Sequence, residues 1–159
     1  MALRRLGGGP AGVSVVVRGL AGVDTGYRQA AVALRTLAGA TGLAAFDDRL
    51  PEALLLSAPE VAGRLVAVWL GPVLALPAAE AADLLATLEA WVGTGGSTTH
   101  TAQRVHCHRN TVLNRLRRVA AVTGRDLLDA APPVELVLAL RALRVGLPPW
   151  SRPPPGSRP

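Results

Sequence analysis

The sequence has few aromatic residues and no lysine. Its 159 residues include three Trp, one Tyr and one Phe, whereas half of all residues are apolar. A packed core is therefore possible, but Leu, Val and Ala must fill most of it. All 17 basic residues are Arg, and we attribute this to coding bias rather than to function.

Disulfides and long apolar runs are also missing. The one cysteine, Cys107, excludes an intramolecular disulfide and suits a reducing compartment. The apolar run at residues 13–17 ends at Arg18 and is too short for a signal peptide. The longest apolar stretch, residues 65–77, is shorter than a membrane span and contains Gly71-Pro72. We therefore expect a cytoplasmic protein without a membrane segment.

Acidic residues are absent from one continuous part of the chain. Residues 1–89 hold seven Arg and eight acids, and residues 126–159 hold four Arg and three acids. Residues 90–125 hold six Arg and no acid, so this window accounts for the whole net charge of +6. Such a localised positive charge favours nucleic acid as the partner.

Residues 1–76 are predicted to form a small α/β segment followed by helices. Strands are predicted at residues 13–17 and 43–46, on either side of a helix that Asp24 or Thr25 caps and that runs to about residue 38. The apolar face of that helix carries Tyr27, Ala31, Leu34 and Leu37. This order of elements is α/β in character, but two strands do not make an independently stable sheet.

Residues 77–147 are predicted to form a helical domain, and residues 148–159 a disordered proline-rich tail. A helix from residue 77 or 78 to 92 ends at Gly93-Thr94-Gly95-Gly96, and Ser97 or Thr98 caps a short helix to about residue 105. A longer helix over 109–122 ends at Gly124, and a last helix runs from Pro133 to about residue 145. The predicted fold class is mainly α, with a three-helical core, flanking helices and the small N-terminal α/β segment.

The helix at 109–122 has two contrasting faces. Val112, Leu116 and Val119 follow the spacing i, i+4, i+7 and form one apolar stripe. The opposite face carries Asn110, Asn114, Arg117 and Arg118. Asn and Arg are the side chains best suited to bidentate contacts with adenine and guanine edges. This pattern predicts a DNA recognition helix.

The short helix, the turn at His106-Cys107-His108 and the longer basic helix together predict a helix-turn-helix. Ala102 is placed where the two helices must approach closely. Asn110, Asn114 and Arg117 are the candidates for base contacts. The candidates for phosphate contacts are Thr98, Thr99, Thr111, Arg109, Arg115 and Arg118.

These residues also resemble a known family. His108-Arg109-Asn110-Thr111-Val112 followed by Arg115-Leu116, within residues 80–145, is similar to the C-terminal helix-turn-helix of PucR/CdaR-type transcriptional regulators. The region from residue 13 to 46 resembles the end of the GGDEF-like domain that often precedes it. The resemblance implies a bacterial regulator that binds operator DNA as a homo-dimer or higher oligomer. It also implies that the sensory domain and the start of the GGDEF-like domain are missing.

Other functions fit the sequence less well. A DNA-bending protein of low specificity and a helical module that binds no DNA stay open as alternatives. A nucleotide cyclase would need metal-binding carboxylates at a glycine-containing hairpin, and Asp47-Asp48 lacks the glycines, so we expect no enzyme. His100, His106, Cys107 and His108 match no common zinc spacing, so we expect no metal and no cofactor.

Overall fold

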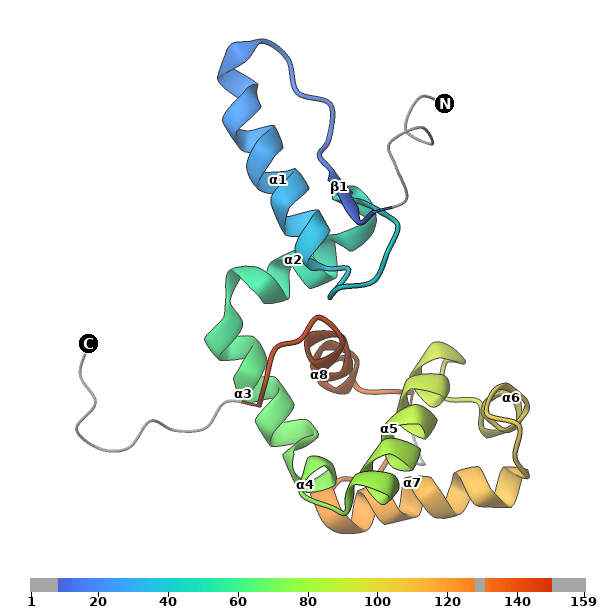
Figure 1. Cartoon of the computed structure of the whole chain (residues 1–159). Coiled ribbons are helices and arrows are strands. Elements are labelled where there is room, and N and C mark those ends of the chain that lie inside the picture. The colour runs from blue at the N-terminus through green and yellow to red at the C-terminus, as the bar shows by residue number, and fades with distance from the viewer. Residues whose placement is uncertain (1–8, 128–130, 150–159) are drawn as a thin grey trace, which may run out of the picture. The chain divides into compact units, whose positions relative to one another are not determined.

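A computed structural model describes residues 9–127 and 131–149 (Figure 1). The predicted disorder of residues 150–159 lies outside that part of the chain. The chain divides into two compact units: Met1–Ala62 with Arg141–Leu147, and Gly63–Leu140 with Pro148–Pro159. The boundary predicted between residues 76 and 77 stays a prediction.

The first unit contains two short strands and a few helices. Its elements are β1 (Ala11–Val13), η2 (Leu20–Gly22), α1 (Val23–Arg35), β2 (Leu43–Ala45), η3 (Asp47–Arg49) and α2 (Leu50–Ser57). The second unit is helical, with α4 (Gly71–Leu74), α5 (Ala78–Gly93), α6 (Thr98–Arg104) and α7 (Arg109–Thr123). Helices α3 (Pro59–Trp69) and α8 (Val134–Arg144) supply residues to both units. The predicted fold class, mainly α with a small α/β segment, is confirmed.

The two strands pair in parallel, and α1 crosses between them. Ala11, Gly12 and Val13 lie opposite Leu43, Ala44 and Ala45. Gly12 lies so close to α1 that a β-carbon there would stand 1.9 Å from the carbonyl oxygen of Ala30. The glycine therefore permits the strand to pack directly against the helix backbone.

The first strand was predicted at the wrong residues. It covers Ala11–Val13 and not residues 13–17. Its partner β2 offers three residues for pairing and leads into η3, so the β-branched residues that follow Val13 have no strand to pair with. Val16 is 94% exposed. A strand is only as long as its partner, and the valine run could not show this.

Helix α1 also differs from its prediction. Neither Asp24 nor Thr25 caps it; the residue at the N-cap is Gly22, without a side-chain hydrogen bond. The helix buries Gly26 and Ala33, whereas Tyr27 is 74% exposed and Leu34 is 40% exposed. Close packing against the backbone of β1 requires small side chains, so the small-residue face and not the larger apolar face points inward.

The core of the second unit lies among α5, α6 and α7, which contact one another pairwise, and α4 packs on α5 and α7. Leu84, Leu88 and Trp91 of α5 are buried. Val112, Leu116 and Val119 of α7 are buried with them. The predicted helices over residues 77–92, 98–105 and 109–122 are confirmed to within one residue.

Candidate nucleic-acid interface

The turn between α5 and α6 is fixed by hydrogen bonds to its backbone. The indole Nε1 of Trp91 donates to the carbonyl oxygen of Gly96 at 2.8 Å. The hydroxyls of Thr94 and Thr101 lie 2.8 Å apart, and Thr101 Oγ1 donates to the carbonyl oxygen of Ser97 at 2.7 Å. Gly95 and Gly96 both adopt positive φ, at 63° and 89°. The glycines of the sequence pattern thus allow a turn that a buried tryptophan then holds in place.

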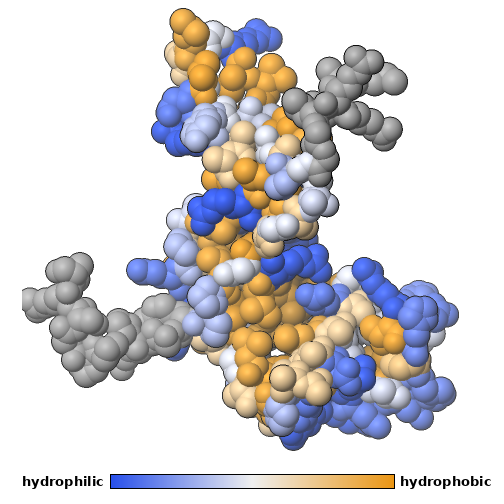
Figure 2. Space-filling view, viewed as in Figure 1, coloured by the Kyte–Doolittle hydropathy of each residue, from blue (hydrophilic) through white to orange (hydrophobic). Residues whose placement is uncertain are grey.

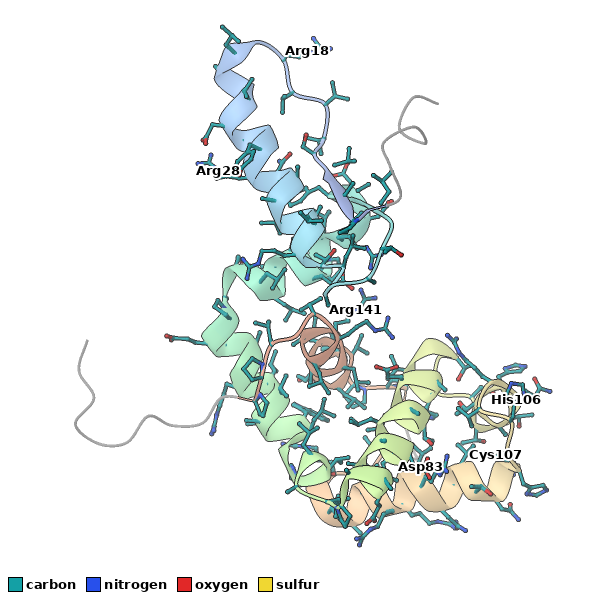
Figure 3. All side chains as sticks on the ribbon, in the orientation of Figure 1. Arg18, Arg28, Asp83, His106, Cys107 and Arg141 are labelled. Atoms are coloured by element: carbon teal, nitrogen blue, oxygen red, sulfur yellow. The ribbon has the colours of Figure 1, made fainter. Side chains whose placement is uncertain are left out.

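Helices α6 and α7 meet at a tight turn, as the sequence predicts. Ser97 caps α6 by accepting a hydrogen bond from the backbone N–H of His100 at 3.3 Å. Ala102 is buried, and its carbonyl oxygen accepts from the N–H of Cys107 at 3.0 Å. His106 lies in this turn with φ of 51°, in the left-handed region (Figure 3).

The start of α7 is capped by a histidine. Nδ1 of His108 accepts a hydrogen bond from the backbone N–H of Asn110 at 3.2 Å. Nδ1 must therefore carry a lone pair, so in the neutral ring the proton sits on Nε2. Gly124, with φ of 68°, closes the helix at its other end, as predicted.

The face of α7 that points away from the core is polar. Asn110, Asn114 and Arg117 are all exposed, and Arg117 Nη1 donates to Asn114 Oδ1 at 3.4 Å. Both residues of this hydrogen bond belong to α7. The surface over α6 and the adjoining end of α7 is largely hydrophilic in the space-filling view (Figure 2). The three predicted base-reading side chains therefore share one solvent-facing surface.

Two predicted phosphate ligands, Thr98 and Arg109, lie together where the first residues of α6 and α7 meet. Nε of Arg109 donates to Thr98 Oγ1 at 3.1 Å. This bond places a guanidinium group at the start of both helices. Thr99 and Thr111 are also exposed, at the first turns of α6 and α7.

Arg115 and Arg118 have partners on α5 that sequence reasoning missed. Arg115 Nη2 forms an ion pair with Asp83 Oδ2 at 2.7 Å, and Arg118 Nε forms one with Glu80 Oε1 at 2.7 Å. The two acids lie outside the acid-free window, so the charge count did not include them. The i, i+3 spacing of both the acids and the arginines was the available signal.

The histidines and the cysteine near the turn do not converge. Among the described residues, no three His, Cys, Asp or Glu side chains are grouped closely enough to hold a metal ion. His106 and Cys107 lie in the turn, and the thiol of Cys107 lies 3.6 Å from the carbonyl oxygen of His108 (Figure 3). His108 uses one ring nitrogen for the helix cap. Capping accounts for His108 without a metal.

Comparison with known protein families identifies a known domain in the region from α5 to α8. Residues 84–142 match the PucR C-terminal helix-turn-helix domain. The match begins within α5 and ends within α8, so it includes the whole of α6 and α7. The resemblance found in the sequence motif is confirmed for the helix-turn-helix; the GGDEF-like segment has no such support.

Two of the proteins that are similar to this chain are named as regulators. The purine catabolism regulatory protein of Bacillus subtilis is 38% identical over 63 residues, which are 40% of this chain and 12% of that protein. The crystal structure of a regulator of polyketide synthase expression from Bifidobacterium adolescentis aligns with a TM-score of 0.42 and 25% identity, over 80% of this chain and 52% of that one. The chain thus spans a small part of the first protein and about half of the second.

Within residues 9–127 and 131–149, none of the helices is both long enough and apolar enough to cross a membrane.

Proposed function

We propose that this chain is a sequence-specific DNA-binding transcriptional regulator, or the DNA-binding part of one, and that α7 inserts into the major groove. The observation that carries the proposal is the outward face of α7 within a PucR-type helix-turn-helix. It presents Asn110, Asn114 and Arg117 to solvent, while Val112 and Leu116 behind them are fully buried. The amides and guanidinium group are thus supported by a packed helix, which base recognition requires.

Each of the three side chains has a defined role in this proposal. Asn110 and Asn114 read adenine edges, and Arg117 reads the O6 and N7 atoms of guanine. The bond between Arg117 and Asn114 fixes neighbouring donors and acceptors on adjacent turns. A DNA surface can replace this bond, because both groups are exposed.

Phosphate contacts come from the rim of the same surface. Arg109 is held at Thr98, and Thr99 and Thr111 add hydroxyl donors on either side. Such contacts set the register of the protein on the duplex and supply most of the affinity.

The helix-turn-helix match also supports the wider context. The B. subtilis relative is named a purine catabolism regulatory protein. We infer that the partner here is double-stranded DNA, bound by a homo-dimer or higher oligomer in the cytoplasm. The parallel β–α–β arrangement of residues 11–45 is compatible with the end of a GGDEF-like domain.

The test is to change the outward face one residue at a time. Replacement Asn114→Ala or Arg117→Ala should reduce discrimination between the preferred duplex and a scrambled one by about 1–3 kcal/mol per lost base contact. Arg109→Ala is the matched control, because loss of a phosphate contact weakens both duplexes alike. The measurement is the dissociation constant for both duplexes at one salt concentration.

The alternatives give different results in the same assay. A DNA-bending protein of low specificity would bind the parent duplexes with nearly equal affinity, and none of the three substitutions would change their ratio. A helical module with another partner would show no salt-dependent binding to either duplex.

A further inference from the structure

The face of α7 that points to α5 carries an ordered set of polar contacts. Arg115 makes two of them, to Asp83 Oδ2 at 2.7 Å and to Thr87 Oγ1 at 3.2 Å. Thr87 is 1% exposed, and its hydroxyl donates to the carbonyl oxygen of Asp83 at 2.8 Å. The hydroxyl proton is thus committed to the α5 backbone, so its lone pair is the acceptor for Arg115.

A second contact continues the set along both helices. Arg118 lies three residues after Arg115, and its partner Glu80 lies three residues before Asp83. The opposite order shows that α5 and α7 run antiparallel here. Glu80, Asp83 and Thr87 form one stripe on α5, since their spacing is i, i+3, i+7. We refer to the contacts of these three residues with Arg115 and Arg118 as the α5–α7 ladder.

The ladder contributes little to stability. Asp83 has an exposed side chain (65%), and the side chains of Arg118 and Glu80 are 49% and 36% exposed. Ion pairs at such exposure are screened by solvent and are worth little. Charged pairs between helices instead select one register and one rotation over the others. A planar guanidinium group held by two acceptors, as at Arg115, restricts the rotation of its helix more than a single hydrogen bond does.

The same contacts disfavour phosphate binding at Arg115 and Arg118. Both arginines line a groove between α5 and α7 together with Glu80, Asp83, Thr111 and Asn114. A phosphate that approached either guanidinium group from this groove would meet a carboxylate already bound there. Asn114, which faces DNA in the proposed function, also lines this groove. Figure 3 shows Asp83 on α5, beside α7.

We propose that Asp83 and Glu80 are specificity-positioning residues. Through Arg115 and Arg118 they fix the rotation and the axial register of α7, so that Asn110, Asn114 and Arg117 face the base edges together. Neither acid contacts DNA in this account. The proposal rests on the proposed function, because a register matters for specificity only if α7 reads DNA.

The first experiment removes one acid without changing its shape. Asp83→Asn should lower the ratio of affinities for the preferred and scrambled duplexes by about two- to fivefold, the range that one exposed ion pair can supply, because Arg115 then holds α7 less firmly against α5. Glu60→Gln on α3 is the control: it makes the same change in net charge at an exposed site and should leave the ratio unchanged. If Arg115 were instead a phosphate ligand released from Asp83, the Asn variant would bind both duplexes more tightly at an unchanged ratio, which would overturn the proposal.

A second experiment exchanges the charges of the outer pair. Arg118→Glu alone places two acids opposite each other and should lower discrimination further than Asp83→Asn does, and the double variant Glu80→Arg/Arg118→Glu should restore it to within about twofold. A phosphate ligand at Arg118 would not be restored by the exchange. In that case the slope of log K against log salt would also fall by about 0.9.

A third measurement separates this proposal from the proposed function. In the protein without DNA, nuclear Overhauser contacts between the Thr87 methyl group and the Arg115 side chain should weaken in Asp83→Asn, with the unfolding temperature within a few degrees of the parent. Unchanged contacts would contradict the ladder even if DNA binding were confirmed. Absence of DNA binding by the parent, with the contacts present and sensitive to Asp83, would contradict the proposed function and leave the ladder as a structural contact between α5 and α7.

Discussion

His106 is the point at which the turn between α6 and α7 carries backbone strain. Its φ of 51° lies in the left-handed region, which a β-carbon disfavours by about 1–2 kcal/mol. The side chain is exposed, so no packing depends on it. The sequence showed a turn here but could not show which of its residues adopts the positive φ.

Replacement His106→Gly should therefore stabilise the protein. We expect a gain of about 0.5–1 kcal/mol, since glycine relieves the strain but loses more entropy on folding. His106→Ala is the control, because alanine keeps the β-carbon and should give no gain. Urea denaturation of the three proteins measures the difference. A glycine variant no more stable than the alanine variant would show that the turn is not strained.

His108 shows what a sequence pattern can and cannot predict about one side chain. It lies directly before α7, and its ring nitrogen accepts the hydrogen bond that caps the helix. The partners of Arg115 and Arg118 were not predicted, because Glu80 and Asp83 lie more than 30 residues away along the chain. Local hydrogen bonds follow from local sequence, whereas a bond between helices depends on how the helices pack.

Helix α1 and strand β1 can pack closely because Gly12 has no side chain. The ideal β-carbon at Gly12 would lie 1.9 Å from the carbonyl oxygen of Ala30 and 2.6 Å from the N–H nitrogen of Leu34. Both atoms belong to helix backbone, so neither can move without displacing the helix.

Replacement Gly12→Ala should accordingly loosen α1 from β1. We expect a loss of about 1–3 kcal/mol, the usual cost of overpacking. Amide hydrogen exchange should become faster in α1, whereas exchange in α5 to α7 should not change. Gly9→Ala is the control, because a β-carbon at Gly9 would meet nothing within 4 Å. Equal protection of α1 in both variants would contradict the close approach.

The elements of the two units were predictable to different degrees. The helices from residue 78 onward have long apolar stripes and clear glycine ends, and these signals act within one helix. The strand at residues 11–13 depends on pairing with residues 43–45 and on a contact of Gly12 with α1. The run of valines predicted a strand at residues 13–17 instead, because strand propensity carries no information about the length of the partner strand.

The positive charge that α7 presents to solvent depends on the folded structure as well as on the sequence. The sequence places a net charge of +6 in residues 90–125. Folding brings Glu80 and Asp83 onto two of those six arginines, so the field around α7 is weaker than the count implies. Salt dependence of DNA binding should therefore reflect fewer than six phosphates per protomer, with a slope per protomer shallower than about −5 in log K against log salt.

Selection from random duplex DNA measures whether α7 reads base sequence. The parent protein should enrich one short motif, with two-fold symmetry if it binds as a dimer. Asn114→Ala or Arg117→Ala should lose the preference at one or two positions of each half-site. Recovery of unrelated sequences with the parent protein, at an affinity equal to that for the starting pool, would contradict base reading by α7.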